Sequence, residues 1–301
     1  MASTPHFFGV LNLHKPAGIS SRKVVDRVQR IVRPAKAGHA GTLDPLASGV
    51  LVVCVGPATR LIPYVQEGVK EYRARFLLGR TSDTDDLEGE VVEVAGGETP
   101  VARERIEEAL PRFVGDIAQV PPRFSAVHVE GRRAYELARR GEAVEIAPRT
   151  VHVERIELVR YEHPELDLHI TCGSGTYIRS IGRDLGNALG CGAVMAELVR
   201  TRIGPFTLEA AVPLDRLDAA SLPAHLLPAA TAVAHLPQWR CDEAEVALLR
   251  NGRAIVAALA DVPPQATVAI LDPQGELAAL AEHRADEGRL APRQVFLKSD
   301  E

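Results

Sequence analysis

The sequence predicts an α+β protein with a large N-terminal region and a smaller, β-rich C-terminal region. Apolar residues recur at helical spacing in residues 22–33 and 178–189, whereas residues 50–55 and 166–172 have the character of strands. A connector rich in Ala, Leu and Pro (residues 213–237) precedes a series of short β-like runs. A chain of 301 residues is long enough for one large domain and one small domain.

The first predicted helix begins near Arg22, where Ser20 or Ser21 can cap its amino end, and it ends at Pro34. Aliphatic residues at helical spacing form its buried face: Val24, Val25, Val28, Ile31 and Val32. Basic residues occupy its exposed sides: Arg22, Lys23, Arg27, Arg30 and Arg33.

Residues 72–78 largely alternate between apolar and basic side chains, which predicts a strand with Tyr72 on its inward face. A packing role in the core is the alternative for this tyrosine. Residues 151–161 and 166–172 predict two more strands, and a helix follows residues 173–175. Arg179 falls in the first turn of that helix, where a cation is unfavourable, so we expect either an anionic partner or an exposed side chain.

The remaining elements are shorter. Thr99 and Pro100 are expected to open a helix with the apolar stripe Ile106, Leu110, Phe113 and Val114. Residues 132–140 predict a short basic helix that Gly141 closes. We place a domain boundary near residue 235, which gives domains at 1–235 and 236–301. The second should hold a helix at 243–250 and β-like runs at 254–259, 267–271, 277–281 and 295–297.

Composition excludes several classes of protein. The four cysteines form no C-x-x-C pair, which argues against a zinc site and a disulfide framework. No charged leader and no membrane-length apolar run is present, so we expect a cytoplasmic protein with no membrane partner. The polar residues 81–86 lack the glycine and the closing glutamate of a calcium loop, and no nucleotide-binding loop occurs, so we expect neither metal nor cofactor.

The most informative segment is residues 38–49, GHAGTLDPLASG, which run directly into the apolar strand at residues 50–55. Its glycines permit tight turns, and Pro45 biases Asp44 toward an extended conformation. A stiff loop on a rigid element is a common way to present a reactive side chain. The alternative is an ordinary tight loop in which Asp44 bonds its own backbone.

This segment resembles the catalytic motif of the TruB family of tRNA pseudouridine synthases, with Asp44 at the essential aspartate. Further motifs of the family follow in order between about residues 10 and 202: KPAGISS at 15–21, KEY at 70–72, VPPRFSA at 120–126 with YELAR at 135–139, and GSGTYIRSI at 173–181. Five ordered motifs over some two hundred residues form a specific signal. The C-terminal region more weakly resembles a reduced PUA domain, an RNA-binding module.

The resemblance implies the pseudouridine synthase fold, in which helices flank a central, mainly antiparallel mixed sheet. It implies that the chain isomerises uridine 55 in the T loop of tRNA as a stand-alone monomer, without cofactor or obligatory protein partner. Asp44, Tyr72 and Arg179 fall on its catalytic residues, while the route taken at Asp44 (attack on the sugar, attack on the base or elimination) stays open. Its substrate-binding positions fall on His39, Gly41, Leu43, Arg60, Tyr177, Leu198 and Lys15, with Arg60 where relatives often carry lysine.

The charge distribution is compatible with an RNA substrate. The formal net charge is −5, but residues 1–60 hold eight Lys and Arg against two Asp and Glu. RNA binding depends on a local basic face rather than on the overall charge. We therefore expect RNA contact near the Asp44 loop, with a merely solvated helix face as the alternative.

Three other functions remain open from the sequence. A non-catalytic RNA-binding protein or tRNA chaperone could keep the fold, although Asp44, Tyr72 and Arg179 argue against it. A nucleoside hydrolase would need a second carboxylate, for which the nearby acidic residues 83–86 are the candidates. A pseudouridine synthase could also act on another RNA.

Overall fold

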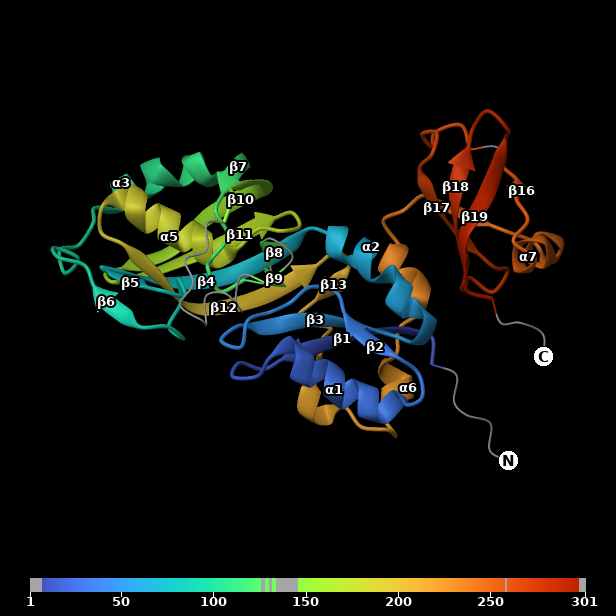
Figure 1. The fold of residues 1–301 in the computed structure, drawn as a ribbon, viewed down its shortest axis with the longest axis horizontal. Coiled ribbons are helices and arrows are strands. Elements are labelled where there is room, and N and C mark those ends of the chain that lie inside the picture. Colours follow the sequence, from blue (N-terminus) through green and yellow to red (C-terminus); the bar gives the residue numbers. More distant parts are fainter. Residues whose placement is uncertain (1–6, 126–127, 130–131, 134–145, 258, 298–301) are drawn as a thin grey trace.

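The computed structural model describes residues 7–125, 128–129, 132–133, 146–257 and 259–297 (Figure 1). The N-terminal part contains one ten-stranded sheet with helices on both faces. Its strands are β1 (Gly9–Lys15), β2 (Ala37–His39), β3 (Ser48–Val55), β4 (Lys70–Leu78), β7 (Gly115–Gln119), β10 (Arg149–Glu162), β11 (Glu165–Cys172), β12 (Ala193–Ile203), β13 (Phe206–Thr207) and β14 (Val212–Pro213).

The main path of the sheet runs β14-β1-β3-β12-β4-β11-β10-β7, with β2 paired to β3 and β13 to β12. Only β1 with β14 and β12 with β3 pair in parallel; the other pairs are antiparallel. The expected central, mainly antiparallel mixed sheet is therefore confirmed. Two short hairpins lie outside it: β5 (Arg80–Ser82) with β6 (Val91–Glu93), and β8 (His128–Val129) with β9 (Arg132–Arg133).

The helices cover the sheet because each carries an apolar face. Helix α1 (Ser21–Val32) is capped by Ser20, which accepts from the Lys23 amide, and its buried valines pack on β1 and β3. Helices α3 (Arg103–Ala109) and α5 (Ile178–Leu189) pack over β4, β11 and β12 on the core that contains Tyr72. Figure 1 shows α3 and α5 above the sheet and α1 below it. The shorter helices are η1 (Gly56–Leu61), α2 (Ile62–Glu67), η2 (Leu110–Phe113), η3 (Leu214–Arg216), α6 (Leu222–His225) and η4 (Ala229–Val233).

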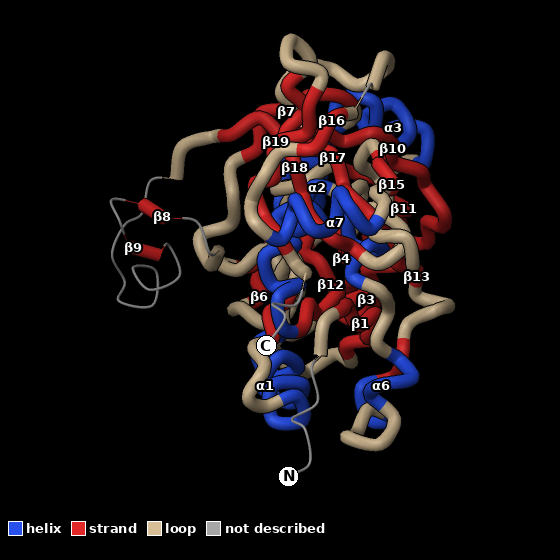
Figure 2. The backbone as a smooth tube through the Cα atoms, turned by 90° about the vertical axis from the view of Figure 1, so that its right-hand side faces the viewer, coloured by secondary structure: helices blue, strands red, loops and turns tan. Residues whose placement is uncertain are grey.

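A second sheet forms the C-terminal part (Figure 2). Its five strands run in the order β15 (Gln238–Arg240), β17 (Thr267–Leu271), β18 (Leu277–Arg284), β19 (Arg289–Val295) and β16 (Ile255–Val256). Helix α7 (Glu243–Arg250) packs beside it and begins with a capping box between Asp242 and Glu245. The β-rich C-terminal region is thus confirmed, whereas the boundary near residue 235 stays a prediction.

The two sheets share a hydrophobic core. Buried residues of the first part, such as Val52 and Leu61, cluster with Leu271 and Phe296 of the second. The Phe296 ring stacks on Phe8 with ring centroids 5.5 Å apart. This shared core fixes the second sheet against the α2 side of the first.

Some predicted elements differ from the structure. Helix α3 begins at Arg103 rather than Thr99, and its last apolar positions continue as a 3-10 turn in which Pro111 interrupts the α-helix. Residues 213–237 contain only short helical turns because Pro recurs in them. Within the predicted basic helix, β9 takes the first two residues, and the other residues lie outside the described part of the chain.

Candidate active site

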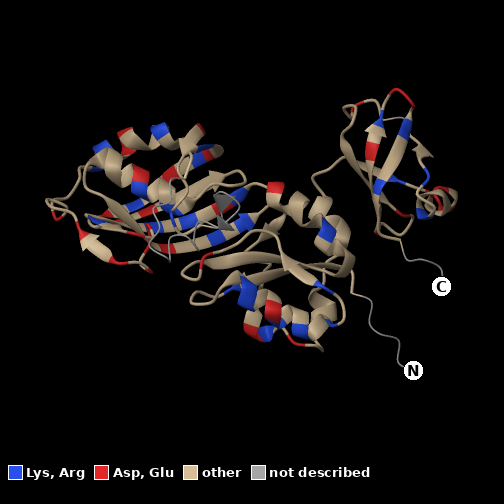
Figure 3. Ribbon diagram, viewed as in Figure 1, with Lys and Arg blue, Asp and Glu red and all other residues tan. Residues whose placement is uncertain are grey.

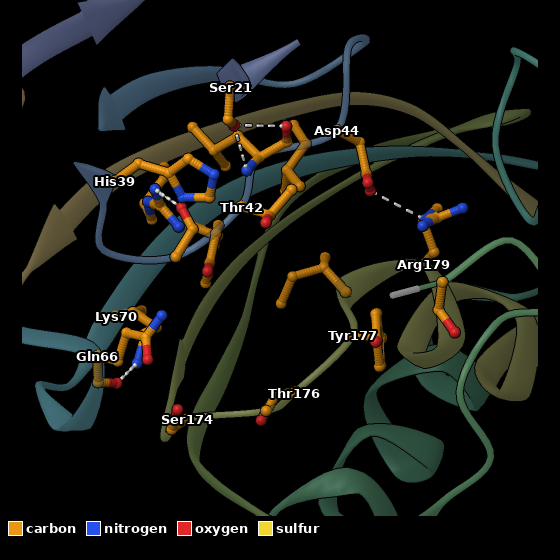
Figure 4. A pocket seen from close by; sticks show the side chains of 18 of the residues that line it. Ser21, His39, Thr42, Asp44, Gln66, Lys70, Ser174, Thr176, Tyr177 and Arg179 are labelled. Atoms are coloured by element: carbon orange, nitrogen blue, oxygen red, sulfur yellow. Dashed lines mark hydrogen bonds and ion pairs between the residues drawn. The ribbon is translucent and has the colours of Figure 1, made fainter. Parts of the chain in front are cut away.

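Asp44 lies on the loop between β2 and β3, which is held by backbone and side-chain contacts. Gly41 has a φ of +107°, a conformation that residues with a side chain rarely adopt. Ser21 Oγ donates to the Leu43 carbonyl oxygen at 2.9 Å and accepts from the Leu43 amide at 2.8 Å. The Asp44 carboxylate points from this anchored loop toward Arg179 (Figure 4).

Arg179 projects from the first turn of α5 and is almost completely buried. Its Nε lies 3.1 Å from Asp44 Oδ2, an ion pair that is not aligned as a hydrogen bond. Its Nη1 lies 3.3 Å from Asp86 Oδ2 and donates to the Thr84 carbonyl oxygen, while Nη2 donates to that of Phe124. The anionic partner expected for this arginine is therefore present, but Asp44 has to share it.

Asp86 belongs to the site, although the sequence suggested it only as one candidate for the second carboxylate of a hydrolase. Its segment otherwise has the character of a polar loop, yet Asp86 is 1% exposed. Its Oδ1 accepts from Thr84 Oγ1 at 2.6 Å and from the Glu88 amide at 3.0 Å, and its Oδ2 faces Arg179. Asp86 therefore fixes the guanidinium from the side opposite Asp44.

The surroundings of Asp44 act on its pKa in opposite directions. Burial raises the pKa of its carboxyl above the ordinary value, and the negative charge of Asp86 raises it further. The positive charges of Arg179 and Lys15 lower the pKa of Asp44, but burial is the larger effect. The carboxylate is thus a poorly solvated base that Arg179 helps to keep ionised.

These side chains open onto a cavity of about 600 Å³, within the range of small-ligand sites. Asp44 is the sole carboxylate among the described residues that line it. Besides Asp44 and Arg179, the lining contains the expected residues His39, Gly41, Leu43, Tyr72, Tyr177 and Leu198. The structure therefore brings together these predicted residues from four separate parts of the chain.

Tyr72 and Leu198 form an apolar part of the wall. They are 6% and 7% exposed and come from the adjacent strands β4 and β12. Tyr177 caps α5, where its backbone exchanges hydrogen bonds with the Gln119 side chain, and Arg149 lies 4.7 Å above its ring. A planar ring could insert between such surfaces.

Beside this apolar wall, on the same two strands, the cavity is cationic. Lys70 and Arg200 line it at 7% and 1% exposure, and neither was expected from the sequence. Burial lowers the pKa of Lys70 to about 8. Burial and the charges of Arg200 and Arg22 lower the pKa of His39, whose Nδ1 is buried without a partner among the described residues.

Two residues expected to bind substrate lie elsewhere. Lys15 is fully buried under the Asp44 loop, where Nζ donates to the carbonyl oxygens of Ile19 and Ala47, each at 2.6 Å, and of Pro16 at 2.9 Å. Its ammonium supports the loop because those carbonyls are the acceptors within reach. Arg60 does not line the cavity.

Arg60 instead contacts the C-terminal sheet. Its Nη2 donates to the Val295 carbonyl oxygen at 2.7 Å, and its guanidinium lies 4.3 Å above the Phe296 ring. The side chain of Arg60 therefore lies against the C-terminal sheet and not in the lining of the cavity that contains Asp44. Arg60 lies on η1, and the order of the motifs in the sequence does not show in which direction its side chain points.

The described residues form neither a membrane-spanning helix nor a metal-binding cluster. No helix in the described part of the chain is long and apolar enough to cross a membrane. Among the described residues, no group of three or more His, Cys, Asp or Glu side chains could hold a metal ion.

Comparison with family models gives two matches that adjoin. Residues 29–178 match the N-terminal domain of the TruB family pseudouridylate synthases, and residues 179–234 match the tRNA pseudouridylate synthase B C-terminal domain. Together they cover more than half of the chain, including Asp44, Tyr72 and Arg179.

Individual relatives point to the same family as the family models. The tRNA pseudouridine synthase B of Gloeobacter violaceus is 50% identical over 236 residues, which cover 76% of this chain and 80% of the relative. That of Thiobacillus denitrificans is 43% identical over 291 residues, covering 96% and 95%. A chain in the solved structure of an H/ACA RNP bound to a substrate RNA is 29% identical with a TM-score of 0.74, covering 97% of this chain and 86% of that one. The chain therefore belongs to the TruB family of pseudouridylate synthases, which are isomerases.

Proposed function

We propose that this enzyme converts uridine 55 in the T loop of tRNA to pseudouridine, with Asp44 as the essential carboxylate. The observation that carries the proposal is the geometry at Asp44: a single carboxylate enters the cavity, and Arg179 pairs with it. The names of the relatives support tRNA as the substrate.

The reaction breaks the N1–C1′ bond, rotates the uracil and forms a C5–C1′ bond, while C5 loses a proton and N1 gains one. The charge that develops during cleavage can be stabilised by Asp44, either by direct attack or electrostatically. The uracil ring would lie between Tyr72 and Leu198, the apolar part of the wall. No net oxidation occurs.

The arrangement argues against the hydrolase alternative. A glycosidase of the usual type needs two carboxylates that flank the scissile bond. Asp86, the second carboxylate near the site, does not line the cavity and is occupied by Thr84, Glu88 and Arg179. One carboxylate in the cavity fits an isomerisation better.

The cavity implies that the target nucleotide leaves the RNA stack. A base within folded RNA has to be extruded before groups in such a cavity can reach it. Arg22 at the rim keeps 78% of its side chain exposed, and α1 carries further basic side chains against one acidic residue, Asp26 (Figure 3). We assign this side to backbone phosphates of the stem-loop and residues 236–301 to a PUA-like RNA contact.

The test is mapping of carbodiimide adducts by reverse transcription on an unmodified tRNA transcript. Wild-type protein should produce one new stop at T-loop uridine 55. Asp44→Asn should produce none, while its affinity for RNA stays within about tenfold of wild type, or about 1.4 kcal/mol. Asp116→Asn is the matched control, because that side chain is 74% exposed and does not line the cavity.

The outcomes separate the alternatives. A stop with Asp44→Asn at the wild-type rate would remove Asp44 from the mechanism. Binding without any stop by the wild-type protein would favour a chaperone or another RNA, and release of free uracil would favour a hydrolase.

A further inference from the structure

Arg200 on β12 has the largest fully buried side chain in the described part of the chain. It is 1% exposed, and no carboxylate of the described residues lies within 4.0 Å of its guanidinium. Burying a charge without an acidic partner is costly unless hydrogen bonds offset the lost hydration. The partners that Arg200 does have therefore indicate what it does.

Two of those partners are the ends of the loop that carries Asp44. Arg200 Nε donates to the Val50 carbonyl oxygen at 2.7 Å, and Nη2 donates to that of Gly41 at 3.1 Å. The backbones are also close, because a Cβ on Gly49 would lie 2.2 Å from the Arg200 carbonyl oxygen. The guanidinium thus fixes the distance between residues 41 and 50, and Asp44 lies between them.

The third partner is Tyr72. In the antiparallel pairing of β12 with β4, Arg200 stands opposite Tyr72, and both line the cavity. Burial raises the pKa of the Tyr72 hydroxyl, while the positive charge of Arg200 opposes that rise. One cation therefore holds the Asp44 loop and lies beside Tyr72 on the neighbouring strand.

We infer that Arg200 is a positioning residue for the isomerisation, which holds the Asp44 loop and Tyr72 in one fixed relation. The inference rests on the proposed function. Arg200 acts through backbone carbonyls and Tyr72 rather than on the reacting atoms. Because a displacement of about 1 Å can slow a reaction about 100-fold, its loss should reduce the rate rather than the affinity for RNA.

The experiment compares Arg200→Met with Arg200→Lys in the full chain, using single-turnover pseudouridine formation in a T-loop RNA and a separate measurement of RNA binding. Arg200→Met should lower the rate constant about 100-fold. Arg200→Lys keeps the charge and can reach one carbonyl oxygen, so its rate constant should be at least about fivefold higher than that of Arg200→Met. Both variants should bind RNA within about threefold of wild type.

Arg202→Met is the matched control. Arg202 lies two residues further along β12, but its side chain is 50% exposed and contacts Glu71 and the Gly204 carbonyl oxygen outside the cavity. It should react at the wild-type rate. Thermal melting of each variant identifies any that does not fold.

A folded Arg200→Met protein with the wild-type rate would overturn the inference, as would a loss of RNA affinity equal to the loss of rate. If Arg200→Met does not fold, Arg200→Lys decides by the same criteria, with a loss of about tenfold in rate expected. Absence of product from the wild-type protein would instead contradict the proposed function. Product from wild type, none from Asp44→Asn and full activity from both Arg200 variants would contradict the role of Arg200 alone.

Discussion

At the scale of single residues, the centre of the site is a chain of three charged groups, Asp44, Arg179 and Asp86. The resemblance to the TruB family predicts the first two, and the local pattern is compatible with both: glycines and a proline surround Asp44, and Arg179 is a cation in the first turn of α5. The sequence does not place Asp86 beside Arg179 and gives no role to Arg200. Their partners lie about 90 and 150 residues away along the chain, a separation that no local pattern encodes.

The chain of charges makes a prediction about pH. If Asp44 acts in its ionised form, as proposed, then because burial raises its pKa the acidic limb of the rate profile should lie above the ordinary aspartate value of 3.8. Asp86→Asn removes a negative charge that raises this pKa, so the limb should move to lower pH. Single-turnover rates between pH 4 and 8 measure it, and an unmoved limb would show that Asp86 does not act on Asp44.

The same shift has a consequence for stability. The pKa of Asp44 is higher in the folded chain than in the unfolded chain, so the folded state binds more protons near that pKa. Keeping Asp44 ionised therefore costs stability above its folded pKa, and the cost disappears as the pH falls toward the unfolded value. Asp44→Asn removes this cost, so we expect the variant used in the carbodiimide mapping experiment to be folded and stable.

At the scale of elements, the period of two along residues 72–78 and the helical spacing in α1 and α5 predict these segments well, since each has one apolar face. The helix predicted at residues 243–250 is observed as α7 with the same bounds. Strand β1 is not among the predicted strands: both its faces are buried, and apolar–polar alternation in GVLNLHK extends over only four residues. Lys15 ends this strand, and its contact with the Asp44 loop depends on how β1 meets that loop.

Lys15→Met tests this contact between elements. The variant keeps the length of the side chain but leaves the Ile19 and Ala47 carbonyl oxygens without their donor. We expect the free energy of unfolding to fall by about 2 kcal/mol, because buried acceptors lose a charged donor. Urea unfolding measures it, with Lys23→Met on exposed α1 as the control. Equal stability of the two variants would contradict a supporting role for Lys15.

At the scale of the whole molecule, the shared core joins the two sheets. The composition of residues 236–301 predicts a separate β-rich unit but cannot show that its Leu271 and Phe296 pack on the first sheet. Arg60 takes part in the same junction, which explains why it is absent from the cavity. Removing residues 236–301 would expose apolar surface, so a point substitution probes the junction more cleanly.

Phe296→Ala should lower the free energy of unfolding by about 3 kcal/mol, since a buried aromatic ring is lost between Phe8 and Arg60. The protein should still unfold in one transition, because the core is continuous across both parts. Calorimetry measures this, with Val256→Ala as the control at a side chain that is 73% exposed. Two separate transitions in the wild-type protein would contradict a common core.

The anchoring of the Asp44 loop through carbonyl oxygens also bears on how this enzyme can vary. Lys15 and Arg200 hold main-chain atoms that every amino acid possesses, so an exposed side chain of the loop such as Thr42 can be exchanged without loosening the anchors. The tolerance of the loop to mutation should thus be high at its exposed positions and low at Asp44, the glycines and the buried residues Leu43, Ala47 and Val50. Intolerance should extend to Lys15 and Arg200, two positions that lie outside the loop in the sequence.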